Sequence, residues 1–309
     1  MARYGLLFPG QGSQFVGMGS DLYERFPACR DVYDRAEQVL ELPIRRLSFE
    51  GPEEELRQTR YTQPAILTHS LAVLAALPEL TPGMAAGHSL GEYAALYAAG
   101  SLDFVTVLRL VKRRAELMYS EGTRNPGSMA AIIGLEAAVL ETLCKEADGV
   151  VVPANYNEPR QTVVSGEPAA VKQVTDLASS RGAIKTVMLP VSGAFHSPLL
   201  SESAREFSSL LEQVNVKPPV FPVIMNVTGR PVLDAIVVRE NLARQLISPV
   251  RWHQTMLAAR ELGFTEFLET GPGNVLAGLA RRIDREFRVT PLGRAVEIDT
   301  FLKTQERAG

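Results

Sequence analysis

The sequence predicts an α/β protein in which a large domain with a parallel-sheet core is interrupted by a small inserted domain. With 309 residues, of which 46% are hydrophobic and 22% charged, the chain can bury a large core. Short apolar runs alternate with longer amphipathic patterns at both ends of the chain, and this order changes between residues 127 and 191. We therefore expect a discontinuous large domain over residues 1–126 and 192–309, and a small domain over residues 127–191.

The large domain is predicted from alternating strand and helix patterns. Short apolar runs predict strands at YGLLF and GMAAG, and amphipathic or small-residue runs predict helices at GSDLYERFPACRDVYDRAEQVL, PAILTHSLAVLAAL and EYAALYAAG. After the insert, strands are expected at FPVIMNVTG, FTEFLETG and VTPLG, among further helices. Such alternation is typical of α/β proteins.

The insert has a different order of elements. SMAAIIGL predicts a strand, EAAVLETLCKEA a helix, GVVVPANYN and QTVVSG two strands, EPAAVKQVTDLASSRG a helix and AIKTVMLPV a strand. The order βαββαβ is the ferredoxin-like pattern, which can fold as a unit within a larger domain.

Composition argues against several classes of protein. A formal net charge of −3 gives no general electrostatic case for a nucleic-acid or membrane partner. Cys29 and Cys144 lie in helix-like segments without metal-type spacing, which favours buried thiols in a reducing compartment. The apolar run at residues 4–8 is too short for a signal-peptide core, and no window resembles a membrane span. We expect a cytoplasmic protein in which the Asn226 glycosylation sequon is idle.

The strongest local signal is GHSLG at residues 87–91, which matches the nucleophile elbow G-x-S-x-G. Flanking glycines allow a sharp strand-to-helix turn that presents the hydroxyl of Ser89, and the helix beginning near Leu90 aims main-chain N–H groups at the same place. The alternative is a plain glycine-bounded turn. A short small-residue run before the motif and a helical pattern after it favour the nucleophile, and an α/β-hydrolase-like large domain.

A serine nucleophile needs a base, and the chain has four histidines. His196 lies in VSGAFHSPLL, just after the last strand of the insert, where irregular backbone at a domain junction often presents catalytic side chains. His88 adjoins Ser89 and should diverge from it, His69 lies within a helical pattern, and His253 begins a helix. His196 is therefore the favoured base, and a structural histidine is the alternative.

The segment LVKRRAELM, residues 110–118, carries an unexpected charge. At about 100° per residue, Arg114 shares a helix face with Val107, Val111 and Met118, whereas Arg113 points elsewhere. A permanently charged guanidinium on the core-facing stripe indicates either a bound anion or an internal ion pair.

Two glycine-rich stretches do not match nucleotide sites. FPGQGSQF and GPGNVL have Phe15 and Leu276 where the third glycine of G-x-G-x-x-G belongs, and no G-x-x-x-x-G-K occurs. The amides of the first stretch can still line the cleft of Ser89.

Taken together, FPGQGSQ, GHSLGEYAAL, the arginine pair, AFHS and the GPG turn resemble malonyl-CoA:acyl carrier protein transacylases over nearly the whole chain. The resemblance implies a ping-pong acyl transfer, in which a serine takes malonyl from malonyl-CoA and passes it to the phosphopantetheine thiol of an acyl carrier protein. It implies no metal or redox cofactor. Carriers of fatty-acid synthesis, of a polyketide synthase served in trans and of a malonate decarboxylase system are all compatible with it.

The resemblance also implies roles for individual residues. Ser89 would be the nucleophile and His196 the general base and acid. Gln11 and Leu90 would supply the main-chain N–H groups of an oxyanion hole, and Arg114 would hold the malonyl carboxylate, which favours a diacid over acetyl.

Further positions are matched less closely. The SPVRW segment suggests that the main chain of Arg251 orients His196, and Asn155 and Asn157 match positions near the cleft, with turn formation as an equally good account. Phe195 and Leu90 resemble the malonyl-selecting rather than the methylmalonyl-selecting branch of the family. The alternatives are a serine hydrolase or thioesterase with the same dyad and a catalytically silent carrier-binding subunit.

Overall fold

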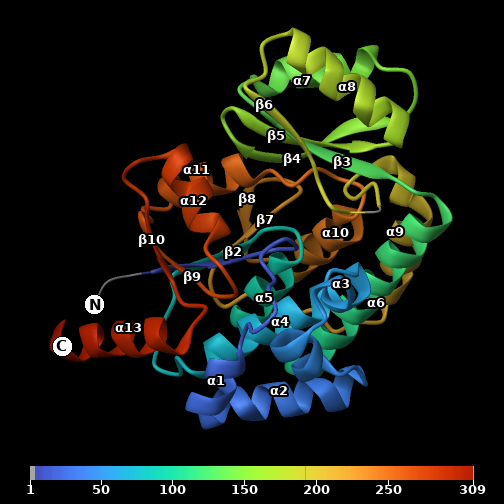
Figure 1. Ribbon diagram of the computed structural model, residues 1–309. Helices are drawn as coiled ribbons and strands as arrows, with labels where there is room; N and C mark the ends of the chain where they lie inside the picture. Colours follow the sequence, from blue (N-terminus) through green and yellow to red (C-terminus); the bar gives the residue numbers. More distant parts are fainter. Residues whose placement is uncertain (1–3, 192, 309) are drawn as a thin grey trace.

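The computed structural model describes residues 4–191 and 193–308, which form two β-sheets with their covering helices (Figure 1). Residue 192, where the second segment of the large domain is predicted to begin, lies outside the described residues. The exact domain bounds stay a prediction. No helix in the described part of the chain combines the length and apolar character needed to cross a bilayer.

The larger sheet has the order β10-β9-β1-β2-β7-β8 within the described residues. Every neighbouring pair is parallel except β7 with β8. The strands are β1 (Gly5–Phe8), β2 (Met84–Gly87), β7 (Val223–Met225), β8 (Arg230–Val232), β9 (Glu266–Glu269) and β10 (Arg288–Pro291). The predicted parallel core is confirmed. The short antiparallel strand β8, which contains a proline, was not predicted.

Alternate residues of β1 point to opposite faces of this sheet. Leu6 and Phe8 pack into one buried cluster, and Leu7 packs into another that includes Trp252. The helices around the sheet are α1 (Ser20–Arg25), α2 (Pro27–Leu40), α3 (Glu53–Leu56), α4 (Thr59–Ala75), α5 (Gly91–Ala98), α6 (Phe104–Arg124), α9 (Ser201–Glu212), α10 (Ala235–Gln245), α11 (Trp252–Glu261), α12 (Val275–Ile283) and α13 (Ala295–Ala308). A π-helical turn, η1 (Arg46–Glu50), and a 3₁₀ turn, η2 (Pro198–Leu200), complete this part.

The smaller sheet is antiparallel, with the order β4-β5-β3-β6. Its elements are β3 (Ser128–Ile133), α7 (Ala137–Glu146), β4 (Val151–Glu158), β5 (Gln161–Gly166), α8 (Pro168–Ser180) and β6 (Lys185–Met188). Helices α7 and α8 cover the outer face of the sheet, at the top of Figure 1, and form a separate core with it. This is the predicted ferredoxin-like arrangement. The opposite face of the sheet, turned toward the rest of the molecule, closes one side of a cleft.

Candidate active site

Ser89 lies at a sharp turn between β2 and α5. Its φ is 51°, in the left-handed region that glycine usually occupies. A side chain at Gly87 would collide with the main chain of Gly91, and one at Gly91 would collide with the main chain of Phe8. Both glycines of the motif are therefore needed for β2, the turn and β1 to pack this closely. The turn leaves the Ser89 hydroxyl in a cleft of about 270 Å³.

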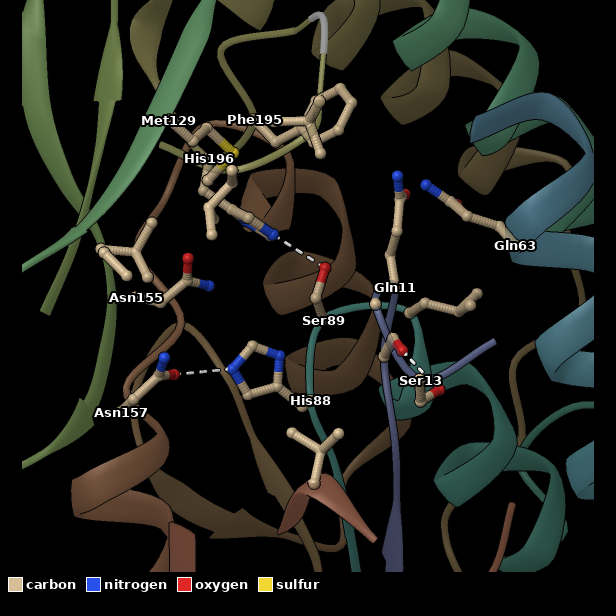
Figure 2. Close-up of a pocket in the computed structure, with 18 of the residues that line it drawn as sticks. Gln11, Ser13, Gln63, His88, Ser89, Met129, Asn155, Asn157, Phe195 and His196 are labelled. Atoms are coloured by element: carbon tan, nitrogen blue, oxygen red, sulfur yellow. Dashed lines mark hydrogen bonds between the residues drawn. The ribbon is translucent and has the colours of Figure 1, made fainter. Parts of the chain in front are cut away.

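His196 reaches Ser89 from the segment that follows the small domain. Its Nε2 lies 2.7 Å from Ser89 Oγ, and the two side chains point toward one another in Figure 2. His196 also has a left-handed φ, 58°, and its ring is almost fully buried. Burial first, and the charge of Arg114 second, lower the pKa of His196 to about 3. The imidazole is therefore neutral at physiological pH and can accept a proton from Ser89.

The far side of the imidazole is held by main-chain carbonyls. Nδ1 lies 2.9 Å from the carbonyl oxygen of Gln245 and 3.1 Å from that of Ser248, so this nitrogen carries the proton. The prediction that Arg251 has this role is wrong, because the carbonyls in contact with Nδ1 are those of Gln245 and Ser248, and the Arg251 carbonyl instead accepts from Thr255 N at the start of α11. Gln245 ends α10, and the last carbonyls of a helix have no N–H donor within their own helix. The proline at position 249 was the sequence signal for this free helix end.

Arg114 is fully buried, as its position on the apolar face of α6 predicted, whereas the side chain of Arg113 is 43% exposed and pairs with Glu116 and Glu206. Arg114 Nη2 lies 3.0 Å from Ser89 Oγ. Its other acceptors are amide oxygens, Gln63 Oε1 at 2.7 Å from Nη1 and Gln245 Oε1 at 3.2 and 3.0 Å from Nε and Nη2. The predicted alternative, an internal ion pair, is not present among the described residues.

The ring of Tyr93 lies 5.5 Å from Arg114 Cζ and supports the cation from one side. Arginine has five N–H groups, and four of those of Arg114 have acceptors. By distance, Nη1 has one acceptor, Gln63 Oε1, for its two N–H groups, and the Tyr93 hydroxyl is a further polar group near the guanidinium. The edge formed by Nη1 and Nη2 is the part that can receive an anion beside the nucleophile.

Two main-chain N–H groups are free near Ser89. Within the described residues, neither Gln11 N nor Leu90 N donates a hydrogen bond. Both residues line the cleft with Ser89, Gln11 from the turn after β1 and Leu90 at the start of α5 (Figure 2 labels Gln11). Free N–H groups at such a turn are suited to a developing negative charge.

Sequence reasoning missed the buried polar side chains beneath the turn. Asn226 accepts from Ser89 N at 2.7 Å and donates to Gly87 O at 2.6 Å, which ties β7 to the elbow. Its position directly after a strand parallel to β2 was the available signal, because ligand-facing residues gather at the carboxyl ends of parallel strands. Gln245 and Gln63, described above, left no such signal in the sequence.

Two other histidines, His88 and His69, have local partners. His88 Nε2 lies 2.9 Å from Asn157 Oδ1 (Figure 2), and its ring packs against that of Trp252. His69 is buried, with Nε2 3.0 Å from the carbonyl oxygen of Gly293, and burial lowers its pKa to about 4. Neither is placed to act on Ser89.

The cleft is shared between the two sheets. Asn155 and Asn157 line it from β4, so they are strand residues and not the turn residues of the alternative account. The rest of the lining is largely apolar and includes Met118, Met129, Ala131, Val163, Leu189, Val191, Phe195, Leu276 and Leu279. A polar dyad, a buried cation and free amides therefore open into an apolar passage, which suits a ligand with a long uncharged arm.

Comparisons with known proteins point to one family. A family model described as an acyl transferase domain matches residues 6–293. The malonyl CoA-acyl carrier protein transacylase of Bacillus subtilis (strain 168) is 40% identical over 309 residues, which cover 98% of this chain and 98% of that protein. The structure of the malonyl CoA-acyl carrier protein transacylase from Coxiella burnetii superposes with a TM-score of 0.94 at 38% identity, covering 97% of each chain. A type II PKS malonyl-transacylase in complex with its acyl-carrier protein, PlMCAT:AntF, superposes with a TM-score of 0.95 at 38% identity, covering 98% of this chain and 100% of that chain. The chain belongs to the acyl transferase family.

Proposed function

We propose that this protein transfers a malonyl group from malonyl-CoA to the phosphopantetheine thiol of an acyl carrier protein, through a malonyl ester on Ser89. The observation that carries the proposal is the contact between a buried arginine and the nucleophile, with Arg114 Nη2 3.0 Å from Ser89 Oγ. The relatives named as malonyl transacylases, and the relative solved with an acyl-carrier protein, support it.

In the first half-reaction, Ser89 Oγ attacks the thioester carbonyl and its proton passes to His196 Nε2. The carbonyl oxygen becomes an oxyanion that accepts from the N–H groups of Gln11 and Leu90. Collapse of this tetrahedral intermediate breaks the carbon–sulfur bond. The leaving coenzyme A thiolate takes the proton from His196, and malonyl-Ser89 remains.

The second half-reaction reverses these steps with a different thiol. His196 takes the proton of the carrier's phosphopantetheine thiol, and the sulfur attacks the Ser89 ester. Collapse of the second intermediate returns the proton to Ser89 Oγ and releases malonyl-carrier. Acyl transfer between oxygen and sulfur changes no oxidation state, so we propose that neither a metal nor a redox cofactor takes part.

Arg114 sets the length and charge of the acyl group. A carboxylate on the Nη1 and Nη2 edge lies next to Ser89 Oγ, so only one or two carbons fit between it and the carbon under attack. Malonyl has one such carbon. Acetyl has no carboxylate for Arg114, and we expect a strong preference for malonyl.

We also propose a cytoplasmic location, which the two free, buried cysteines, Cys29 and Cys144, fit. Fatty-acid and polyketide synthesis are the pathways that such a product serves.

The test is incubation with malonyl-CoA and a phosphopantetheinylated carrier, followed by mass spectrometry of enzyme and carrier. We expect one malonyl adduct on Ser89 in the absence of carrier, and malonyl-carrier in its presence. Release of free malonate in place of malonyl-carrier would assign a hydrolase, and absence of turnover would assign a silent carrier-binding subunit. An adduct on another residue, such as Cys29, would overturn the assignment of the nucleophile.

A further inference from the structure

Glu92, in the first turn of α5, is a fully buried carboxylate. It forms no ion pair with any described residue, although Arg114 is close enough for its charge to act on it. Burial raises the pKa of Glu92 to about 8, although its hydrogen bonds and the charge of Arg114 act in the opposite direction. A buried, unpaired acid is costly, so its presence beneath the nucleophile needs an explanation.

Both oxygens of Glu92 act as acceptors. Oε1 accepts from Gln245 Nε2 at 2.9 Å, and Oε2 accepts from the main-chain N–H of Asn226. A carboxylate has only acceptors, whereas a protonated acid would bring a donor that has no acceptor here. The geometry is therefore that of the ionised side chain.

The Gln245 partner contacts three parts of the active site. Its Nε2 also donates to Ser89 O at 3.0 Å, its Oε1 accepts from Arg114, and its main-chain oxygen accepts from His196. Because Nε2 faces a carboxylate and Oε1 faces a guanidinium, the amide has one favourable orientation. If it flipped, oxygen would face oxygen at Glu92 and N–H would face N–H at Arg114.

In this arrangement the negative charge of Glu92 is separated from Arg114 by the Gln245 amide, which hydrogen-bonds to both side chains. A direct ion pair would neutralise the cation and weaken its attraction for a substrate carboxylate. The Gln245 amide oxygen instead accepts from Nε and Nη2 of the buried cation without neutralising its charge. The Nη1 and Nη2 edge beside Ser89 stays available.

We propose that Glu92 is a positioning residue for substrate selection, which fixes the Gln245 amide and thereby holds Arg114 charged and open toward the acyl carboxylate. The proposal rests on the proposed role of Arg114 as the malonyl-binding residue. It assigns to Glu92 no contact with substrate.

The test is Glu92→Gln, which keeps the size of the side chain and replaces one acceptor with a donor. Its amide oxygen must face the fixed N–H of Asn226, so its NH₂ group meets the NH₂ group of Gln245. We expect kcat/KM for malonyl-CoA in the first half-reaction to fall about tenfold or more, since an acceptor for a charged group is lost or misplaced. Acetyl-CoA, which makes no use of Arg114, should change by less than about threefold, because its reaction lacks that charge-assisted bond.

A matched control is Glu121→Gln. Glu121 is also a buried glutamate, but it pairs with Arg124 at the far end of α6. This variant should keep the wild-type ratio of malonyl to acetyl reaction. An unchanged ratio in Glu92→Gln, or an equal loss for both substrates together with a lower melting temperature, would show that Glu92 is only structural and would overturn the proposal.

A double variant, Glu92→Gln with Gln245→Glu, separates effects on thermal stability from effects on substrate preference. It again matches each donor between these two side chains and Arg114 with an acceptor, but it places a carboxylate directly on Arg114 and leaves Ser89 O without its donor. We expect the melting temperature to recover in part relative to Glu92→Gln, while the malonyl preference stays low. If the double variant regained the preference for malonyl-CoA over acetyl-CoA, the proposal that Glu92 must act on Arg114 through an amide would be refuted. Failure of the proposed function itself would be recognised separately, as a wild-type enzyme that does not discriminate or an Arg114→Ala variant that still does.

Discussion

Replacing Arg114 with alanine should remove the preference for malonyl over acetyl. The wild-type guanidinium lies beside Ser89 Oγ, has one N–H group without an acceptor and has no acidic partner among the described residues. In the variant the malonyl carboxylate would enter an apolar passage without a counter-charge. Acetyl has no group that Arg114 binds, so it would lose only what both substrates lose when the contact of Arg114 with Ser89 and its charge near His196 are removed.

The magnitude follows from the hydrogen bonds at stake. A carboxylate on the Nη1 and Nη2 edge gains one bond from the free N–H and takes over the bond that now goes to Ser89 Oγ. We therefore count one net charge-assisted bond, about 1.5–3 kcal/mol, which corresponds to a loss of about 10- to 100-fold in kcat/KM for malonyl-CoA. Arg114→Lys keeps the charge but not the planar pair of donors, and should recover only part of the preference.

The assay is single-turnover acylation of Ser89 by malonyl-CoA and by acetyl-CoA, followed by intact-protein mass, alongside thermal unfolding. Arg113→Ala is the control, because Arg113 is exposed and pairs with Glu116 and Glu206 on the outer surface. An equal loss for both substrates in Arg114→Ala, with lower thermal stability, would refute the reasoning and make Arg114 a structural residue.

The remaining predictions concern the Ser89–His196 dyad, the turn at Ser89 and the cleft. His196→Ala should slow acylation by about 10²–10⁴-fold, as measured by rapid quench, while His253→Ala stays close to wild type. Because the pKa of free His196 is lowered to about 3, its base form persists on acidification, and kcat/KM for acetyl-CoA, which does not depend on Glu92, should stay level from pH 8 to pH 5; a fall centred near pH 6.5 would contradict the assignment. Bound malonyl offsets the charge of Arg114, so the acidic limb of kcat should lie at higher pH than that of kcat/KM. Gly91→Ala, which would collide with Phe8 main chain, should lower both the melting temperature and acylation. Phe195→Ala should raise the relative rate with methylmalonyl-CoA, measured by competition with malonyl-CoA, since this side chain lines the cleft. An unchanged ratio would show that Phe195 does not exclude acyl groups with a methyl branch.

The sequence predicted the parts of the site that have a local signature. Ser89 lies in a glycine-flanked motif, and Arg114 interrupts the apolar face of a helix. The βαββαβ order of the insert follows from the local patterns of consecutive segments. The structure places the Ser89 and Arg114 side chains together with His196, which a weaker signal had favoured.

The supporting residues could not be predicted in the same way. Gln245 acts through its amide, its carbonyl and its place at the end of a helix, and each of these depends on long-range packing against α5 and α6. The mistaken choice of Arg251 shows the same limit. The prediction placed the acceptor for His196 in the correct loop, but only the end of α10 decides which carbonyls of that loop are free.

The left-handed backbone of Ser89 and His196 is required for activity but lowers the stability of the fold. Among the described non-glycine residues, only Glu41, Ser89 and His196 have positive φ, and such a conformation costs about 1–2 kcal/mol in a residue with a side chain. Glycine would relieve this cost at positions 89 and 196 but would abolish the chemistry. Selection for thermal tolerance alone would therefore favour glycine at position 89, whereas at position 196 the loss of a buried, hydrogen-bonded ring would offset the gain. Stabilisation that preserves turnover has to come from elsewhere in the fold, and a screen without an acyl-transfer readout would favour inactive variants.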